Sequence, residues 1–406
     1  MNGMTKKWIC MLLSVLLALT VMAAPAEQKT ETESGKSGVT WLDMAQEAIQ
    51  EGDFESSFYF SEKGAESGKA LGQYFLAVHY SLGWGTEPSE EKAAEYFRLA
   101  ADQGLDAAQY NLAVMYERGD SVEQSYEKAA EYYQLAADQG FPDAQRALAS
   151  YYESGTVVDQ SYEKAAENYQ LAADKGDAIA QQRIGDYYRN GWVVEQSNEK
   201  AAKYYQMSAD QGFAPGQERL GLCYEWGEGV EQSYEKAAEY YQLAADQGDS
   251  EAQVDLGLMY ENGTGVLKSG KKAFELYQKA AEQGNAYGLA SLGNCYIYGV
   301  GVMPDYPKAV EYYQMAAEKG NPWGLYGMGQ CYQFGMGVGT DYEKAAEYYR
   351  QGAEQEDPDC LECLGYLYLQ GLGVEQSTDK ALELYRRAAE LGSEEAQRQL
   401  QILDKQ

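Results

Sequence analysis

The chain has 406 residues, of which 45% are hydrophobic, so it can bury a folded core. Its 64 acidic and 32 basic residues give a formal net charge of −32, which argues against nucleic acid and anionic lipid head groups as direct ligands. The charge could favour a basic partner, although solubility of a long exposed surface is the simpler explanation.

Residues 1–24 have the pattern of a secretory signal peptide. Lys6 and Lys7 precede an apolar run over 9–22, and small residues suited to cleavage follow it. The run is short for a membrane span, and an uncleaved signal anchor is the alternative. Residues 25–40 are polar and mixed, as in a flexible linker. The sequence therefore predicts export to the periplasm, the cell surface or the medium, without direct membrane insertion after cleavage.

Residues 41–68 form a short helical pattern that we expect to be an N-terminal capping hairpin. From residue 69 to residue 392, a motif with the form Lys-Ala-x-x-Tyr-Tyr-x-x-Ala-Ala recurs every 36 residues in nine copies without insertions. A fixed period of this length is typical of a solenoid, in which each unit packs only on its neighbours. Residues 393–406 are expected to form a C-terminal capping helix. The motif lysines are Lys92, Lys128, Lys164, Lys200, Lys236, Lys272, Lys308, Lys344 and Lys380.

Each copy reads as two helices joined by a loop, as the copy at 105–140 illustrates. Its first half has apolar residues at helical spacing and ends at Gly119. After a short loop, Ser125 is suited to cap a second helix, which carries the Tyr-Tyr and Ala-Ala pairs and ends at Gly140. We therefore predict a helical hairpin whose helices have about 12–15 residues. The tyrosines are expected to pack hairpin on hairpin and to supply a large buried ring area with polar tips.

These copies resemble Sel1-like repeats, which are related to tetratricopeptide repeats. The pattern Ala-x-x-x-Leu-Gly-x-x-Tyr-x-x-Gly-x-Gly-Val, followed by the lysine motif, is recognisable at 252–284 and 288–320. The resemblance covers 69–392 and implies an all-α, right-handed superhelical solenoid, a bacterial exported type of protein, and a scaffold or adaptor role. The chain departs from the pattern where Ser121, Val157 and Val193 replace the second loop glycine and Glu356 replaces a helix-ending glycine, so those loops are expected to differ in shape.

No constellation in the sequence indicates catalysis. His79 is the single histidine, and it occupies a repeat position that elsewhere holds Met, Tyr, Cys or Leu, so a packing role is favoured over a base. The Gly-x-Gly turns follow helices rather than strands, which excludes a phosphate-binding loop of the usual kind. We therefore predict no catalytic, cofactor-binding or metal-binding residue, no cofactor, and no enzyme activity.

Five cysteines remain after removal of the signal peptide, and free buried thiols are the favoured interpretation. A bridge between Cys331 and Cys363 of neighbouring helices is the alternative, while equivalent cysteines of adjacent copies are expected about 10 Å apart, beyond disulfide reach. The spacing of Cys360 and Cys363 gives only a weak indication of a metal or redox pair. The five are Cys223, Cys295, Cys331, Cys360 and Cys363.

Positions that vary between copies are the candidates for recognition. The end of the first helix and the following loop are polar in early copies and become apolar in later ones, which predicts an exposed apolar stripe centred on the seventh to ninth copies. Local packing under the loops or against the terminal helix is the alternative explanation. The candidate partner-binding residues are Trp226, Ile297, Tyr298, Val300, Trp323, Tyr326, Phe334, Met336, Leu369 and Leu372.

Two functions remain open at this point. The first is a non-catalytic, monomeric scaffold that binds a protein or peptide, possibly a basic one, in the concave groove of the superhelix. The alternative is an exported protein that binds cell-wall or other polysaccharide, with hydrolysis as a less favoured variant.

Overall fold

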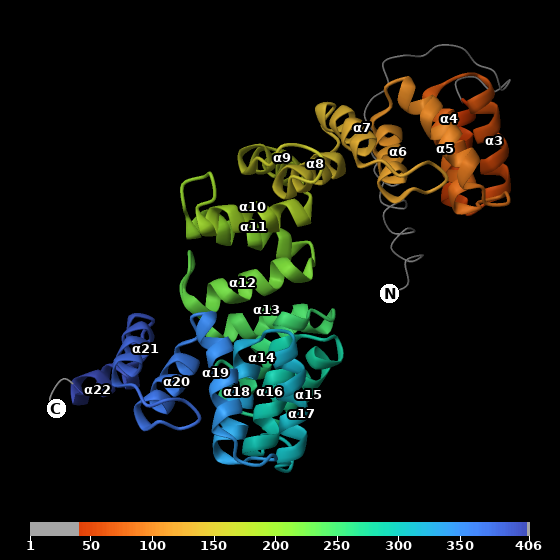
Figure 1. Ribbon diagram of the computed structural model, residues 1–406. Coiled ribbons are helices and arrows are strands. Elements are labelled where there is room, and N and C mark those ends of the chain that lie inside the picture. The colour runs from red at the N-terminus through yellow and green to blue at the C-terminus, as the bar shows by residue number, and fades with distance from the viewer. Residues whose placement is uncertain (1–39, 404–406) are drawn as a thin grey trace. The chain divides into compact units, whose positions relative to one another are not determined.

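The computed structural model describes residues 40–403, which fold into two compact units divided after residue 197 (Figure 1). The described residues contain the helices α2 to α22 and no strand. The all-α fold and the repeated helical hairpins predicted from the sequence are thus confirmed. The predicted signal peptide and most of the predicted linker lie outside the described residues.

The first unit begins with the hairpin that was predicted to cap the array. Three complete repeats and the first helix of a fourth follow it, and each repeat has a first helix with an even number and a second helix with an odd one. The helices are α2 (Trp41–Glu51), α3 (Phe54–Glu66), α4 (Ala70–Leu82), α5 (Glu90–Asp102), α6 (Asp106–Arg118), α7 (Tyr126–Asp138), α8 (Pro142–Ser154), α9 (Tyr162–Asp174) and α10 (Ala178–Asn190).

The first unit, taken over its described part, holds that hairpin, three complete repeats and the first helix of a fourth. The second unit starts with the second helix of the fourth repeat and ends with the predicted capping helix. Its helices are α11 (Asn198–Asp210), α12 (Ala214–Trp226), α13 (Tyr234–Asp246), α14 (Ser250–Asn262), α15 (Gly270–Glu282), α16 (Ala286–Tyr298), α17 (Tyr306–Glu318), α18 (Pro322–Phe334), α19 (Tyr342–Glu354), α20 (Pro358–Gln370), α21 (Thr378–Glu390) and α22 (Glu394–Leu403).

Hydrogen bonds at the helix ends explain why each repeat folds as a hairpin. The Ser125 hydroxyl accepts a hydrogen bond from the Lys128 backbone N–H at 3.2 Å, which satisfies a donor that has no partner inside the helix. The Gly119 N–H donates to the Met115 carbonyl at 2.8 Å and closes the first helix with a φ of 76°. The same Ser or Asp cap is present at Ser89, Ser125, Ser161, Ser233, Ser269, Asp305, Asp341 and Ser377.

The second loop glycine brings each loop close to the preceding repeat. At Gly301, which has a φ of 70°, an added Cβ would lie 2.2 Å from the Gly270 carbonyl oxygen, so only glycine fits. Where other residues replace this glycine, the outcome differs. Ser121 and Val193 keep a positive φ, of 56° and 52°, so the predicted change of loop shape is wrong for their backbone turns, whereas Val157 does not adopt a positive φ. Glu356 likewise keeps a positive φ, of 59°, at its helix end.

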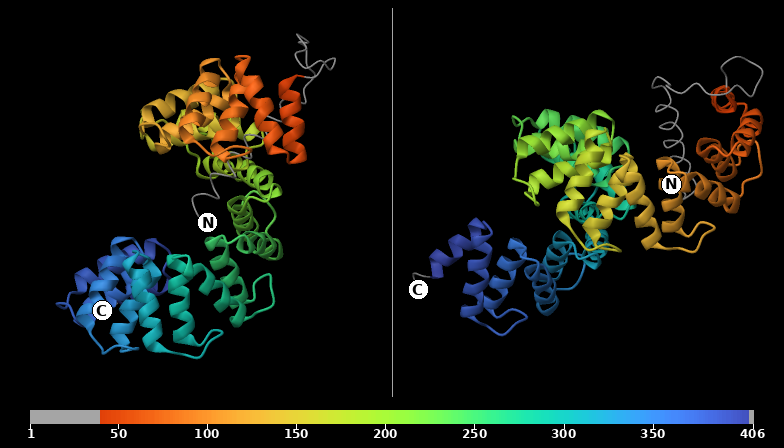
Figure 2. Two further views of the ribbon diagram at one scale, coloured as in Figure 1. Left: turned by 90° about the vertical axis from the view of Figure 1, so that its right-hand side faces the viewer. Right: turned by 90° about the horizontal axis from the view of Figure 1, so that it is seen from above.

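Helices of consecutive repeats form two layers in the second unit (Figure 2). Each first helix packs against its own second helix and against the second helix of the preceding repeat. First helices also contact one another, from α14 to α16, α18 and α20, so they make a continuous layer. The buried alanines of the second helices, such as Ala237 and Ala244 at 0% exposure, allow this close approach.

The tyrosines are the principal large side chains of the core. The aromatic residue at the second position of the Tyr-Tyr motif is buried, and in several copies its hydroxyl donates to a side chain of the first helix: Tyr277 to Glu261 at 2.7 Å and Tyr349 to Gln333 at 2.7 Å. The lysine of the motif places its Nζ over the first-helix tyrosine, as Lys272 does 4.5 Å from the ring centre of Tyr260. The rings that keep the 36-residue period are therefore architectural.

Candidate partner-binding site

Three of the ten candidate residues expose large aromatic side chains. Trp226, Tyr298 and Phe334 are the last residues of α12, α16 and α18, and they are 65%, 68% and 63% exposed. Each directly precedes a helix-ending glycine, so all three occupy the same place in the repeat. Five of the other six copies have polar residues at this position, and the first copy has the buried Leu82. The five polar residues are Arg118, Ser154, Asn190, Asn262 and Gln370.

The other residues at the helix ends and in the loops pack inward, which corrects the prediction of one continuous exposed stripe. Ile297 is only 9% exposed, and it belongs to the core around Cys331. The residues at the equivalent position in the adjacent copies, Glu261 and Gln333, each accept a hydrogen bond from a tyrosine of their own second helix. The side chain of Ile297 therefore also points toward its second helix. The partly buried residues that pack against core clusters are Val300, Met336, Leu369 and Leu372.

Trp323 and Tyr326 lie on α18, toward its beginning. Trp323 is 38% exposed and contacts Tyr287 edge-to-face, with ring centres 5.0 Å apart. Tyr326 is partly buried against Tyr349, and its hydroxyl accepts a hydrogen bond from Gln330 Nε2 at 2.7 Å. Tyr287, which is 39% exposed, was not among the candidate residues, although it occupies the same repeat position as Trp323 in the next copy.

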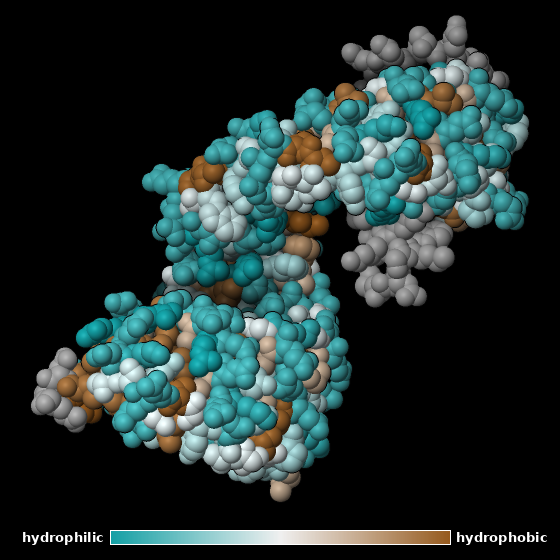
Figure 3. Space-filling model, in the orientation of Figure 1, coloured by the Kyte–Doolittle hydropathy of each residue, from teal (hydrophilic) through white to brown (hydrophobic). Residues whose placement is uncertain are grey.

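The exposed aromatic residues stand out from a largely hydrophilic surface. Figure 3 shows hydrophilic residues over most of the face in view, with hydrophobic residues in small separate patches. In the described part of the chain, no helix is long and apolar enough to cross a membrane.

A cluster of carboxyl groups lies on the first-helix layer of the second unit. Glu218 and Glu225 are on α12, Asp255 is on α14, and the Tyr241 hydroxyl donates to Glu225 at 2.6 Å. Burial raises the pKa of Asp255 to about 8, and repulsion by Glu218 and Glu225 adds to the rise. Arg219 Nε lies 3.5 Å from Glu218. The sequence could not single out this cluster, because acidic residues occur throughout the repeats.

The single histidine is part of the core of the first unit. His79 is fully buried; its Nδ1 donates to the Trp84 carbonyl at 2.7 Å, and its Nε2 lies 2.9 Å from the Ser57 hydroxyl oxygen. Burial lowers its pKa, so the ring is neutral at pH 7. This geometry agrees with the packing role predicted for it. Among residues 40–403, no group of three or more His, Cys, Asp or Glu side chains could hold a metal ion.

The five cysteines of the described chain are all free thiols, and all but Cys363 are fully buried. Cys331 and Cys363, the pair considered for a bridge, are thus not joined. Burial raises the pKa of Cys331 to about 11 and that of Cys363 to about 12. Because the thiolate is the reactive form, these thiols are poor nucleophiles at neutral pH.

Together, the two helical layers, the capped hairpins and the exposed helix ends define a repeat protein of the α-solenoid class. The family model for the Sel1 repeat matches nine segments of this chain, and the chain belongs to the Sel1 repeat family. Repeat proteins of this kind generally bind protein partners and are generally non-catalytic. The matched segments are 70–105, 106–141, 142–177, 178–213, 214–249, 250–285, 286–321, 324–357 and 364–393.

Solved structures support the same assignment. The chain is similar to c5321, a protective antigen present in uropathogenic Escherichia coli strains, with 31% identity over 90% of this chain and 79% of that one, and a TM-score of 0.76. It is also similar to a Sel1 repeat protein from Oxalobacter formigenes, with 25% identity over 94% of this chain and 98% of that one, and a TM-score of 0.54. A comparison with curated proteins gives no match.

Proposed function

We propose that the protein is an exported, non-catalytic scaffold that binds a protein partner through the first-helix ends of its second unit. The observation that carries this proposal is the exposure of Trp226, Tyr298 and Phe334 at a repeat place that is polar in most other copies. Large aromatic side chains at the surface are typical anchors of protein interfaces, because their burial on binding removes much apolar area from water. Trp323, paired with Tyr287, adds a second aromatic contact on α18 and α16.

The carboxyl cluster supports a basic partner. Asp255 is held largely protonated at neutral pH by burial and by the charges of Glu218 and Glu225. A Lys or Arg side chain placed beside these groups would offset their repulsion and favour the ionised form. The net charge of −32 acts in the same direction over longer distances.

Export is supported by the signal-like pattern of residues 1–24 and by the similarity to c5321, which is described as a protective antigen. The non-catalytic role is supported by the buried, neutral His79 and by thiols whose pKa values are raised. We further propose that the chain acts as a monomer.

The test is recovery of partners from extracts of the source cell on immobilised residues 25–406. A triple variant, Trp226→Gln, Tyr298→Asn and Phe334→Gln, places residues like those of the polar copies at the three exposed helix ends. Since interface anchors each contribute about 2 kcal/mol or more, we expect the triple variant to recover at least about tenfold less of any specific partner. Quantitative mass spectrometry measures the recovery.

A matched control removes exposed apolar side chains from loops of the same unit. Leu267 and Met303 are 91% and 81% exposed, and the double variant Leu267→Gln, Met303→Gln should recover partners as the wild type does. Undiminished recovery by a folded triple variant, judged by circular dichroism, would rule out the aromatic helix ends as the site. Loss of binding to purified cell-wall polysaccharide, in place of protein, would favour the alternative function.

A further inference from the structure

A ring-on-ring contact recurs between the two helices of most repeats. The first-helix tyrosine stacks on the first tyrosine of the Tyr-Tyr pair, as Tyr224 does on Tyr240 with ring centres 5.7 Å apart and an angle of 3° between planes. Tyr332 and Tyr348 repeat this contact at 5.8 Å and 11°. The same arrangement is found for Tyr80 and Tyr96, Tyr116 and Tyr132, and Tyr296 and Tyr312.

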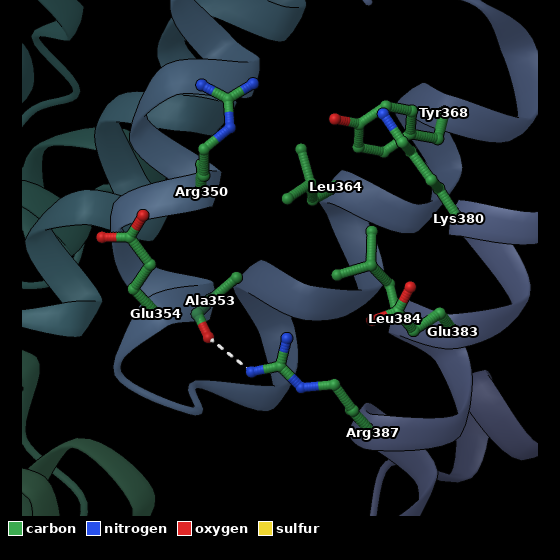
Figure 4. A pocket seen from close by; sticks show the side chains of 9 residues that line it. All are labelled: Arg350, Ala353, Glu354, Leu364, Tyr368, Lys380, Glu383, Leu384 and Arg387. Atoms are coloured by element: carbon green, nitrogen blue, oxygen red, sulfur yellow. Dashed lines mark hydrogen bonds between the residues drawn. The ribbon is translucent and has the colours of Figure 1, made fainter. Parts of the chain in front are cut away.

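In the ninth copy, leucine replaces the second ring of this contact. Leu384 stands where Tyr348 stands in the eighth copy, so Tyr368 keeps its lysine, with Lys380 Nζ 5.0 Å from the ring centre, but lacks its stacking partner. A pocket of about 460 Å³ lies at this place, lined by Leu364, Tyr368 and Leu384 (Figure 4). The missing ring thus coincides with a pocket that has an aromatic and aliphatic lining.

Arg350 lies where the hydroxyl of the missing tyrosine would be bonded. In the eighth copy, the Tyr348 hydroxyl donates to Gln314 Oε1 of the preceding second helix at 2.9 Å. Arg350 occupies the place of Gln314 one repeat later, and it lines the pocket. Among the described residues, Arg350 takes part in no hydrogen bond or ion pair, so its guanidinium can bind a ligand.

An arginine at this repeat place already lies beside aromatic rings elsewhere in the chain. Arg98 Nη2 donates to the Tyr116 hydroxyl at 3.5 Å, and Tyr116 stacks on Tyr132. The second copy therefore serves as a model for a ligand ring bound in the ninth copy. The ring of Tyr132 stacks on the first-helix tyrosine, and the Arg98 guanidinium lies nearby.

The charges around the pocket favour an anion. Lys380 and Arg387 join Arg350 in its lining, against Glu354 and Glu383, so cations exceed carboxylates in a strongly acidic protein. Arg387 is already engaged, since it donates to the Ala353 carbonyl at 3.2 Å and pairs with Glu356. Arg350 is therefore the cation most available to a ligand.

We propose that this pocket binds a planar aromatic ring bearing an anionic group, with the ring stacked on Tyr368 and the anion bonded to Arg350. A free aromatic carboxylate or phosphate has this chemistry, and so does a phosphorylated tyrosine side chain. The pocket lies between the second helices α19 and α21, whereas the aromatic anchors of the proposed partner site end the first helices α12, α16 and α18. Because the two sites share no residue, each proposal can be tested independently of the other.

The sixth copy provides an internal control. It also lacks the second ring, since Leu276 replaces the tyrosine. A pocket of about 580 Å³ lies over Leu256 and Tyr260, although Leu276 is not part of its lining. There the place of Arg350 is taken by Gln242, and Glu235 and Glu239 are part of a lining that contains no cation. This second pocket should not bind an anion.

The experiment measures binding of phenyl phosphate to residues 25–406 by ligand-observed NMR and calorimetry, with phenol and inorganic phosphate as the separate halves of the ligand. For a ligand of this size we expect a Kd of about 0.1–1 mM for phenyl phosphate, and binding at least about tenfold weaker for either half. Leu384→Tyr should weaken phenyl phosphate binding at least about tenfold, because it restores the missing ring and fills the pocket. Leu276→Tyr should leave the affinity unchanged.

Arg350→Gln tests the anion contact by introducing the glutamine that most other copies have at this position. Since charge-assisted bonds to a phosphate are strong, this variant should bind phenyl phosphate at least about tenfold more weakly. Arg350 is exposed, so this variant should fold even if Leu384→Tyr did not, and circular dichroism checks both.

The proposal would be overturned by either of two results: no binding of phenyl phosphate to the wild type up to about 10 mM, or equal binding by the wild type and folded variants of Leu384 and Arg350. A tyrosine-phosphorylated peptide distinguishes the two sources of the ligand. Tighter binding of the peptide than of phenyl phosphate would indicate a protein side chain, and equal or weaker binding would indicate a free small molecule.

Discussion

Replacement of Asp255 by asparagine should make the second unit more stable at neutral and alkaline pH. Asp255 is largely buried on α14 near Glu218 and Glu225, which raises its pKa from 3.8 to about 8. Asparagine has nearly the same shape and no charge, and the chain already uses it at the same repeat place in the second copy, as Asn111. The variant therefore removes the titration with little change in packing.

The sign of the effect follows from proton linkage. Between about pH 4 and pH 8, the folded state of the wild type retains a proton on Asp255 that the unfolded state has lost, so the free energy of unfolding falls as pH rises. Below about pH 4, Asp255 is neutral in both the folded and the unfolded state, so it has no effect on the free energy of unfolding. Above about pH 8, Asp255 is ionised in both states, and the decrease in the free energy of unfolding is complete. A pKa shift of this size corresponds to a loss of at most about 5–6 kcal/mol in the free energy of unfolding. Because the structure relaxes and the carboxylate is partly hydrated, we expect a loss of about 1–3 kcal/mol.

Urea unfolding followed by circular dichroism measures the difference at each pH. We expect the midpoint of Asp255→Asn to exceed that of the wild type by roughly 0.5–1 M at about pH 8, and to approach it near pH 4. Glu239→Gln, an exposed change on α13, should reproduce the wild-type profile. A difference between Asp255→Asn and the wild type that stays constant from acid to alkaline pH would refute the linkage argument.

Two further pairs of variants test the packing of the repeats. Tyr349→Phe should lower the free energy of unfolding by about 1–2 kcal/mol, because it leaves the buried Gln333 oxygen without its donor. Tyr385→Phe should cost less than about 0.5 kcal/mol, because among the described residues Tyr385 donates no hydrogen bond. Val193→Gly should stabilise the first unit by about 1 kcal/mol by relieving a φ of 52°, whereas Val157→Gly should destabilise it by a similar amount. Chemical unfolding ranks all four, and equal effects within either pair would contradict these reasons.

Much of the architecture could be predicted because its signals are local and repeated. A cap such as Ser125 and a stop such as Gly119 act within a few residues of their own helix, and the same signals return every 36 residues. The packing role of His79 was also predictable, because the equivalent residues of other copies are mostly core side chains. Comparison of the copies thus distinguished residues that maintain the fold from variable residues, although no contact was known.

The exposure of the candidate residues was predicted only in part. Ile297 and Tyr298 are adjacent apolar residues, yet one is 9% exposed and the other 68%, because their side chains leave the helix about 100° apart and only one meets the second helix. Likewise, Met336 in its loop packs inward while Phe334, two residues earlier, remains exposed. The increase in apolar residues in the later copies therefore does not show which of these residues are exposed.

The sequence by itself determined the all-α repeat, its hairpins, its caps and its family resemblance, since these depend on interactions within one repeat length. Only the tertiary structure decided which aromatic residues are exposed, that Asp255 meets two other carboxyl groups, and that Arg350 borders the space left by Leu384. The carboxyl cluster and the Arg350 pocket bring together side chains of neighbouring repeats. Asp255, for example, is 30 residues from Glu225 and 37 residues from Glu218 in the chain. Such contacts are created when the hairpins stack, so no local signal in the sequence records them.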